Sequence, residues 1–277
     1  MIAITATMMV VEIATGMLFG SMALLADGLH MASHAAALSI TAIAYFFARR
    51  HAGDARYSFG TGKLNALGGF TGAVLLALFA LLMVSESAGR FLHPVKILFD
   101  QAIFVAVLGL LVNGGSALIL GTGHEHSHDG SAHDHHDHNL RSAYLHVLAD
   151  ALTSVLAIVA LLAGKHLGLA WMDPAMGLVG AALVTRWSWG LLRDSGRVLL
   201  DRQAPPAVLA EVRAAIEAGG RDRVTDLHVW SIGPGLLAAS ITVVSPDPRP
   251  PDHYKNRLAQ RLALAHSTVE VHSSRIE

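Results

Sequence analysis

Two pairs of polar residues lie inside strongly apolar stretches of the sequence. His30 and His34 are four residues apart, and so are His146 and Asp150. Residues four apart lie on the same face of a helix, so each pair presents two metal-ligand side chains together. Ionisable side chains inside a membrane are costly and usually face a bundle interior, an ion pathway or one another. Two such pairs facing each other predict a four-ligand metal site.

The chemistry of this quartet is that of three imidazoles and one carboxylate. These donors are compatible with cobalt, nickel and zinc. Each ligand must lose its proton to bind a divalent ion, so one site can hold metal and protons in turn. The alternative is a set of hydrogen-bonded packing residues between helices. The presence of two matching pairs favours the metal site.

Three further polar residues lie at membrane depth near this pattern. Asp27 is one helical turn before His30, and Glu12 and Asn113 interrupt two other apolar stretches. We expect Asp27 to orient an imidazole or to accept protons, with a helix-start role as the alternative. Glu12 and Asn113 could support the ligands or relay protons, but inter-helix hydrogen bonds are the favoured interpretation for both.

The composition is that of a membrane protein. Hydrophobic residues make up 53% of the chain and charged residues only 15%. The net charge of −1 gives no support to a nucleic-acid partner. Reading for apolar stretches of about twenty residues predicts a bundle of membrane helices. Six such spans are found, at about 1–19, 24–48, 65–88, 100–121, 142–164 and 174–199.

The distribution of basic residues predicts the topology. Basic residues are concentrated after the second span, before the fifth and after the sixth, and the positive-inside rule makes this side cytoplasmic. Both termini are then cytoplasmic. The residues concerned are Arg49, Arg50, Arg56, Lys63, Arg141, Arg193, Arg197 and Arg202.

The first residues indicate a transmembrane helix rather than a signal peptide. They carry no basic region and no small-residue cleavage site. The abrupt apolar start also suggests that an N-terminal extension is missing. Because the chain has no cysteine, neither disulfides nor thiolate metal ligands are possible.

A histidine-rich segment lies between the fourth and fifth spans, within residues 122–140. It holds seven of the 17 histidines and has no apolar periodicity, so we expect a disordered cytoplasmic loop. Imidazoles in such a loop would collect or sense metal ions, and a solvated linker is the alternative. These histidines are His124, His126, His128, His133, His135, His136 and His138.

The chain divides by composition into a transport domain, residues 1–203, and a soluble domain, residues 204–277. Pro205-Pro206 ends the last span, and an ordinary soluble sequence follows. Period-two alternation and turn residues predict a compact α+β domain that dimerises. Its expected elements are a helix at about 206–219, strands at about 224–232 and 236–244, a helix at about 252–266 and a strand at about 268–276.

In six motifs the chain resembles the cation diffusion facilitators, and it is most similar to the cobalt and nickel efflux branch. The resemblance implies a six-helix membrane bundle followed by a small cytoplasmic ferredoxin-like domain. It also implies a homodimer that exchanges metal ions for protons. The motifs are residues 26–34, Tyr57-Ser-Phe-Gly-Thr-Gly-Lys63, the histidine-rich segment, His146-xxx-Asp150, Leu199-Leu-Asp-Arg202 and Asp226-Leu-His-Val-Trp230.

The resemblance also assigns roles to single residues. Lys63 and Asp201 match positions that form an inter-helix charge link in similar transporters, with solvation at the membrane rim as the alternative. Zinc-type members usually carry an aspartate in the pair occupied here by His30 and His34. They also have further histidine ligands in the loop where Thr61 stands and in the soluble domain, where only His253 and His272 remain as accessory candidates.

The sequence therefore predicts a divalent metal exporter, not an enzyme, in a bacterial inner membrane. Cobalt, nickel or zinc would be the transported ion, with cadmium as a further candidate and no resident cofactor. A metal receptor or sensor that binds without transport is one alternative. A membrane di-iron hydroxylase is another, because such enzymes also use His-xxx-His pairs. That alternative is disfavoured, since the second pair here ends in aspartate.

Overall fold

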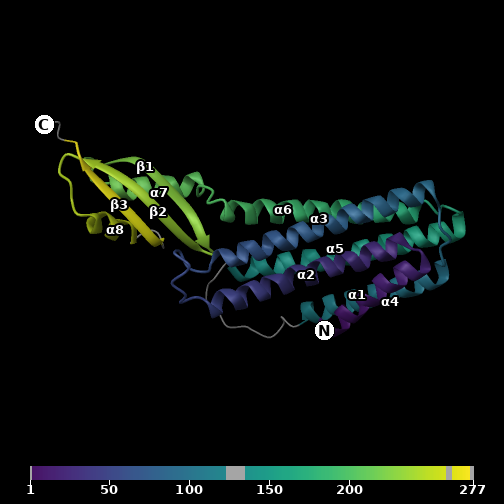
Figure 1. Ribbon diagram of the computed structural model, residues 1–277. Coiled ribbons are helices and arrows are strands. Elements are labelled where there is room, and N and C mark those ends of the chain that lie inside the picture. Colours follow the sequence, from purple (N-terminus) through teal and green to yellow (C-terminus); the bar gives the residue numbers. More distant parts are fainter. Residues whose placement is uncertain (1, 123–134, 260–263, 275–277) are drawn as a thin grey trace. The chain divides into compact units, whose positions relative to one another are not determined.

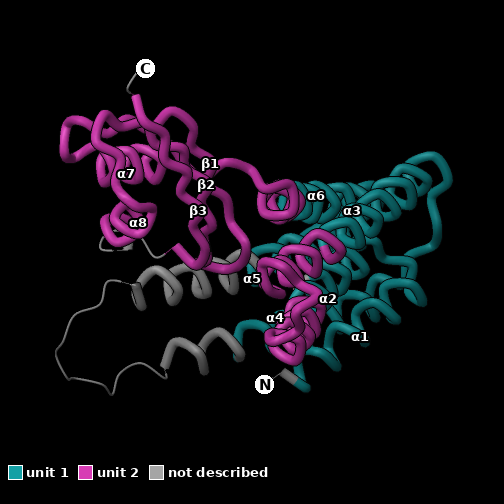
Figure 2. The backbone as a smooth tube through the Cα atoms, turned by 60° about the vertical axis from the view of Figure 1, so that its left-hand side comes forward, with its two compact units in different colours: residues 1–38, 73–189 teal, residues 39–72, 190–277 magenta. Residues whose placement is uncertain are grey.

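The structure is a computed structural model that describes residues 2–122, 135–259 and 264–274. The side chains of residues 2, 34, 116–122, 135–150 and 259 are outside the described part. The chain forms two compact units (Figure 2). The first comprises Met1–Leu38 and Ala73–Trp189, and the second comprises Ser39–Gly72 and Gly190–Glu277.

Each of the six predicted apolar spans forms a long helix (Figure 1). The expected disorder of the histidine-rich segment is wrong from residue 135 onward, because the fifth helix already begins there. Extending a helix adds one hydrogen bond for each residue fixed, so a polar stretch can continue an apolar helix. The helices are α1 (Ile2–Phe19), α2 (Met22–Arg50), α3 (Lys63–Leu92), α4 (Phe99–Thr122), α5 (His135–Leu167) and α6 (Met172–Leu199).

Among the described residues, three helices are long and apolar enough to cross a membrane, namely α2, α3 and α6. The other three contribute shorter apolar stretches: Ala3–Phe19, Phe99–Gly115 and Ala151–Leu167. The chain is thus mostly helical and has the helices of a membrane protein. The number of membrane crossings stays a prediction.

Small residues allow α2 to pack closely against its neighbours in the first unit. A Cβ atom on Gly16 of α1 would come within 2.7 Å of the backbone nitrogen of Leu25. On α6, a Cβ atom on Gly180 would lie 3.0 Å from the Cβ of Ala26. Glycine at helix contacts in membranes permits this approach of backbones. The helix that carries His30 is therefore held at short range on two sides.

An aspartate of α6 caps the start of α2. The carboxylate of Asp173 accepts hydrogen bonds from the Ser21 hydroxyl at 2.7 Å, the Met22 amide at 2.7 Å and the Ala23 amide at 3.1 Å. Ser21 in turn accepts a bond from the Leu24 amide at 3.1 Å. The first amides of a helix lack intrahelical acceptors and carry partial positive charge. Asp173 thus satisfies this helix end and fixes its position against α6.

The C-terminal part of the second unit is a three-stranded sheet with two helices. Strands β1 and β2 are antiparallel, and β3 lies parallel to β2, which gives the order β1-β2-β3. Pro234 and Gly235 form the hairpin turn, where Gly235 adopts a φ of 68°, as glycine readily does. The elements are α7 (Pro206–Glu217), β1 (Arg223–Gly233), β2 (Leu236–Ser245), α8 (Pro251–Ala259) and β3 (Leu264–Ser273).

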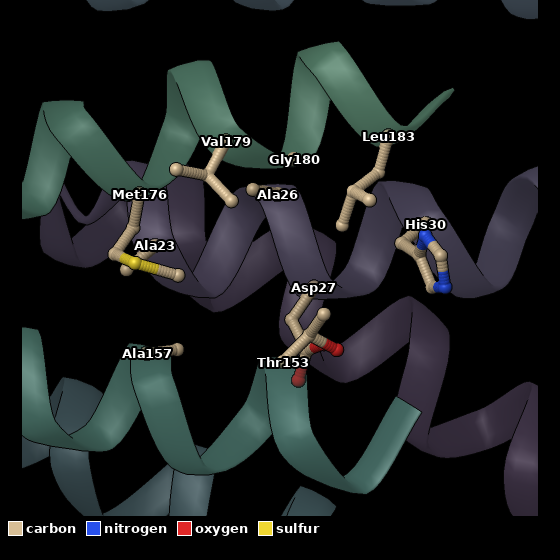
Figure 3. Close-up of a pocket in the computed structure, with 10 residues that line it drawn as sticks. All are labelled: Ala23, Ala26, Asp27, His30, Thr153, Ala157, Met176, Val179, Gly180 and Leu183. Carbon is tan, nitrogen blue, oxygen red and sulfur yellow. The ribbon is translucent and has the colours of Figure 1, made fainter. Parts of the chain in front are cut away.

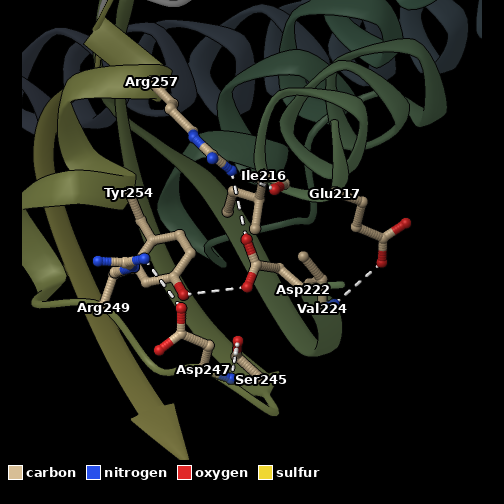
Figure 4. Close-up of polar contacts among 9 residues, drawn as sticks. All are labelled: Ile216, Glu217, Asp222, Val224, Ser245, Asp247, Arg249, Tyr254 and Arg257. Carbon is tan, nitrogen blue, oxygen red and sulfur yellow. Dashed lines mark hydrogen bonds and ion pairs between the residues drawn. The ribbon is translucent and has the colours of Figure 1, made fainter. Parts of the chain in front are cut away.

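The hydrophobic core of this part lies on one face of the sheet. Leu227, Ile241 and Val269 are paired across the three strands and are buried in the same cluster as residues of α7 and α8. Asp222 supports this core (Figure 4), because it accepts hydrogen bonds from the Tyr254 hydroxyl at 3.2 Å and from Arg257 at 3.3 Å. These bonds join α8 to the residue before β1, and Arg257 also donates to the Ile216 carbonyl of α7 at 2.9 Å.

One boundary in this part differs from the prediction. The expected helix at 252–266 is wrong at its end, because residues 264–266 already belong to β3. Helix and strand are hard to separate in short stretches that mix apolar and polar residues. Pairing of Leu264 and His266 with β2 decides for the strand.

Candidate metal site

His30 lies buried in α2, with 3% of its surface exposed. Its ring lies against that of Trp187 on α6, with the ring centroids 4.6 Å apart and the planes at 41°. The hydroxyl of Ser33 donates a hydrogen bond to the His30 carbonyl at 2.6 Å. The helical bundle therefore places this imidazole in its interior, as a metal ligand requires. The sequence analysis did not foresee Trp187.

The other three predicted ligands are His34, His146 and Asp150. His34 belongs to α2, and His146 and Asp150 belong to α5, but their side chains are outside the described residues. Within the described part of the chain, no group of three or more His, Cys, Asp or Glu residues is placed to hold a metal ion. The four-ligand site thus stays a prediction.

Asp27 connects α2 with α5. The Ser154 hydroxyl donates to Asp27 Oδ2 at 2.6 Å, and the Thr153 hydroxyl lies 3.4 Å from Oδ1. Ser154 is four residues after Asp150, which is itself four residues after His146, so the three share one helix stripe. This stripe was a signal that could have revealed Ser154 in the sequence. The hydrogen bond joins the two helices that carry the predicted ligands.

A small cavity lies between α2, α5 and α6 (Figure 3). His30, Asp27 and Thr153 provide its polar lining, and the remaining lining is apolar. Its volume is about 20 Å³, which is enough for one water molecule. His30 therefore forms part of the cavity wall. The cavity is too small for a metal ion that keeps a full shell of water molecules.

Glu12 and Asn113 are also buried, with 0% and 6% of their surfaces exposed. Neither carboxylate oxygen of Glu12 has a hydrogen-bond partner among the described residues. Its side chain fills the space beside Gly28 of α2 and Gly109 of α4. Asn113 donates a weak hydrogen bond to the Met31 sulfur at 3.6 Å, which links α4 to the residue after His30. Neither residue is shown to support the ligands or to relay protons.

Comparison with known proteins identifies the family. The family model of the cation efflux transmembrane domain matches residues 1–200. The chain belongs to the cation diffusion facilitator family. Because members of this family are transporters, the di-iron enzyme alternative is wrong. The chain is an integral membrane protein.

Three curated relatives show how far the similarity extends. The zinc transporter ZitB of Escherichia coli is 33% identical over 97% of this chain and 84% of its own length. The cadmium, cobalt and zinc/H(+)-K(+) antiporter of Bacillus subtilis is 31% identical over 86% of this chain and 74% of its own length. The cation efflux system protein CzcD of an Alcaligenes strain is 30% identical over 97% and 84%. The similarity thus includes both the helical and the C-terminal parts.

In this member of the family, Lys63 and Asp201 are brought together. Lys63 Nζ lies 2.7 Å from Asp201 Oδ1 and 2.9 Å from Oδ2. The two side chains are 33% and 48% exposed, so the pair is partly solvated. Asp201 follows the end of α6 with a φ of 49°, a left-handed conformation that aspartate tolerates better than most residues. The ion pair joins the start of α3 to the end of α6.

The accessory histidines are not gathered into a site by the described residues. His253 lies against Tyr254, with ring centroids 5.4 Å apart, and His272 pairs with Glu270 at 3.1 Å. The first four histidines of the histidine-rich segment, His124, His126, His128 and His133, are outside the described residues. The last three, His135, His136 and His138, begin α5, but their side chains are not described. A metal role for these histidines stays a prediction.

The loop between α2 and α3 is tied by charge and hydrogen bonds. Arg56 binds Asp54 through its side chain at 2.7 Å, and this bond, with a second from the Arg56 amide, lowers the pKa of Asp54. Because the pKa is lowered in the folded protein, the ion pair stabilises the fold at any pH above 3.8, the ordinary pKa of aspartate. This stabilisation is lost as the pH falls below that value. The hydroxyl of Thr61 donates a hydrogen bond to the Ala48 carbonyl at 2.7 Å. Asp54 therefore stays charged at neutral pH, and its ion pair with Arg56 is kept there.

Proposed function

We propose that this protein exports divalent transition-metal ions from the cytoplasm in exchange for protons. Family membership supports export of a cation. The observation that carries the proposal is the buried His30, which lines a cavity together with Asp27 inside the helical unit. Ionisable groups at membrane depth mark ion pathways. The quartet of His30, His34, His146 and Asp150 is the transport site in this proposal.

The metal in this proposal is cobalt, nickel or zinc, with cadmium as a further candidate. The relatives named above are described as carriers of zinc, or of cadmium, cobalt and zinc. The resemblance implies that zinc-type members carry an aspartate in the α2 pair, where this chain has His30 and His34. A third imidazole makes the site softer and less negative, which is compatible with cobalt and nickel as well as zinc. The resemblance noted above, rather than this ligand chemistry, is the reason to propose the cobalt and nickel branch.

Proton coupling follows in this proposal from competition at the site. Imidazole and carboxylate ligands must be deprotonated to bind a divalent ion, and they can be protonated after its release. Rocking of the helices would change the side to which the site opens. The name of the Bacillus relative, an antiporter that uses protons, supports this coupling.

The same proposal covers the membrane topology, the cellular location and the assembly of the protein. We place both termini in the cytoplasm of a bacterial cell, with six spans in the inner membrane and a ferredoxin-like soluble domain. The distribution of basic residues supports this orientation. A homodimer is the proposed assembly.

Ion flux into proteoliposomes with an imposed pH gradient tests the function. Cobalt, nickel and zinc are compared in the wild type, Asp150→Ala and His34→Asp, with the exposed helix-end variant His93→Ala as the control. We expect proton-coupled flux in the wild type and the control, its loss in Asp150→Ala, and a shift toward zinc in His34→Asp. A wild type that binds metal without any flux would reject antiport and support the sensor interpretation.

A further inference from the structure

The cavity beside His30 has its polar lining at one end only. His30 and Asp27 come from α2 and Thr153 comes from α5, whereas Ala23, Ala157 and Met176 line the part farthest from His30 (Figure 3). Asp27 is three residues before His30, which is about 4.5 Å along the helix axis. In the proposed topology this displacement points away from the cytoplasm. The cavity thus extends from the proposed transport site in the direction of export.

The carboxylate of Asp27 has a fixed orientation. It is 6% exposed, and the 2.6 Å hydrogen bond from Ser154 holds Oδ2. The other oxygen, Oδ1, has the longer contact of 3.4 Å with Thr153. A carboxylate held in an apolar bundle is costly unless it interacts with a charge or a hydrogen-bond network. The hydrogen bonds from Ser154 and Thr153 supply such a network, so the carboxylate is held in one orientation at the cavity wall.

The size of the cavity limits the form in which an ion can enter. A volume of about 20 Å³ holds one water molecule, so an ion that keeps six waters does not fit. An ion moving this way must therefore lose most of its hydration water. Among the described residues that line the cavity, Asp27 provides a carboxylate and Thr153 provides a hydroxyl oxygen.

We propose that this cavity is a transfer site for the exported ion, with Asp27 as its metal ligand. In this site a divalent transition-metal ion released from the quartet is held by the Asp27 carboxylate, with His30 and the Thr153 hydroxyl adjacent. Oxygen and imidazole donors together suit cobalt, nickel and zinc. The inference rests on the proposed export function and adds a second binding position to it.

Two variants test the transfer site by different routes. Asp27→Asn removes the ligand charge but keeps the shape, and Ala157→Val fills the cavity without touching Asp27. Ala160→Val is the matched control, because Ala160 is equally buried in α5, with 1% exposed against 3% for Ala157, and does not line the cavity. Cobalt(II) is the probe, measured both as equilibrium binding to purified protein and as initial flux into proteoliposomes.

We expect both test variants to lower the initial cobalt flux at least about tenfold while the Kd of the quartet changes less than about threefold. The control should stay within about twofold of the wild type in both measurements. Thermal unfolding of each variant confirms that it is folded, and if Asp27→Asn fails to fold, Ala157→Val decides the question alone.

Two results would overturn the transfer site. If Asp27→Asn weakens cobalt binding as much as Asp150→Ala does, Asp27 only supports the quartet. If the flux of both test variants equals that of the wild type, the cavity is not on the path. A wild type without cobalt flux rejects the export function instead, so the two failures are distinguishable.

Discussion

At the scale of single residues, Asp201 has two separable properties. It pairs with Lys63, and it adopts a left-handed backbone conformation with a φ of 49°. Asn and Gly both tolerate this conformation, whereas Ala does so at a cost of about 1 kcal/mol. A partly exposed ion pair contributes on the order of 0–1 kcal/mol. The backbone, rather than the charge, should therefore dominate the effect of a substitution on stability.

We accordingly expect Asp201→Asn and Asp201→Gly to unfold at similar temperatures, and Asp201→Ala to unfold at a lower one. Thermal unfolding of the purified proteins at low and high salt shows how the unfolding temperatures of the three variants rank. Equal losses in Asn and Ala would show instead that the ion pair with Lys63 dominates, and high salt should then remove the difference from the wild type.

Site residues could be predicted from the sequence when they interrupt an apolar helix at a regular spacing. His30 and Asp27 were predicted from this pattern, and the structure places both on one cavity. Trp187 and Asp173 were missed. A single tryptophan in an apolar span, or a single aspartate at a helix start, belongs to no repeated pattern that would point to a partner in a distant part of the chain. Contacts across more than 150 residues depend on how helices pack, which local pattern does not encode.

At the scale of secondary structure, the helices were predicted well and their ends less so. Long apolar spans and the Pro234-Gly235 turn are strong local signals. The start of β3 was placed too late, because its first residues gain their strand conformation from pairing with β2. The early start of α5 was missed for the opposite reason, since polar residues can extend a helix that an apolar stretch has established.

The cap of α2 by Asp173 gives a prediction at this scale. Asp173→Ala removes the acceptor for one hydroxyl and two backbone amides at a buried helix end. Buried donors left without partners cost about 1–3 kcal/mol, and loss of a cap typically costs about 1 kcal/mol. We expect a loss of stability of about 2–3 kcal/mol in thermal or denaturant unfolding.

Asp100→Ala is the matched control for this prediction. Asp100 also lies in the first turn of a helix, but its side chain is 74% exposed, and its one ion pair among the described residues is with Lys165. Its removal should cost less than about 1 kcal/mol. If the two variants are equally stable, Asp173 does not fix α2 and the hydrogen bonds at its start are replaced by solvent.

At the scale of the whole molecule, the second unit combines helix ends with the C-terminal sheet. It contains residues 39–72 together with residues 190–277. The loop residue Phe59 lies edge-on to Trp230 and His266, with ring centroids 6.1 and 5.4 Å away. Gly62 packs directly on the β1–β2 hairpin, where a Cβ atom would lie 2.7 Å from Gly233 Cα and would overlap the Ile232 carbonyl. This contact is between backbones, so it cannot be relieved by a side-chain rotation.

Substitution of Gly62 by alanine should therefore separate the loop from the hairpin. We expect a loss of stability of about 1–3 kcal/mol, as for other overpacked sites, and faster amide hydrogen exchange in residues 231–236. Gly53→Ala is the control, because Gly53 lies in the same loop with nothing within 4 Å of its added Cβ. Its stability should stay within about 0.5 kcal/mol of the wild type. Unchanged exchange of the hairpin in Gly62→Ala would show that the loop and the sheet move independently. Faster exchange together with slower metal flux would instead make this contact the link through which the soluble part affects the transport helices.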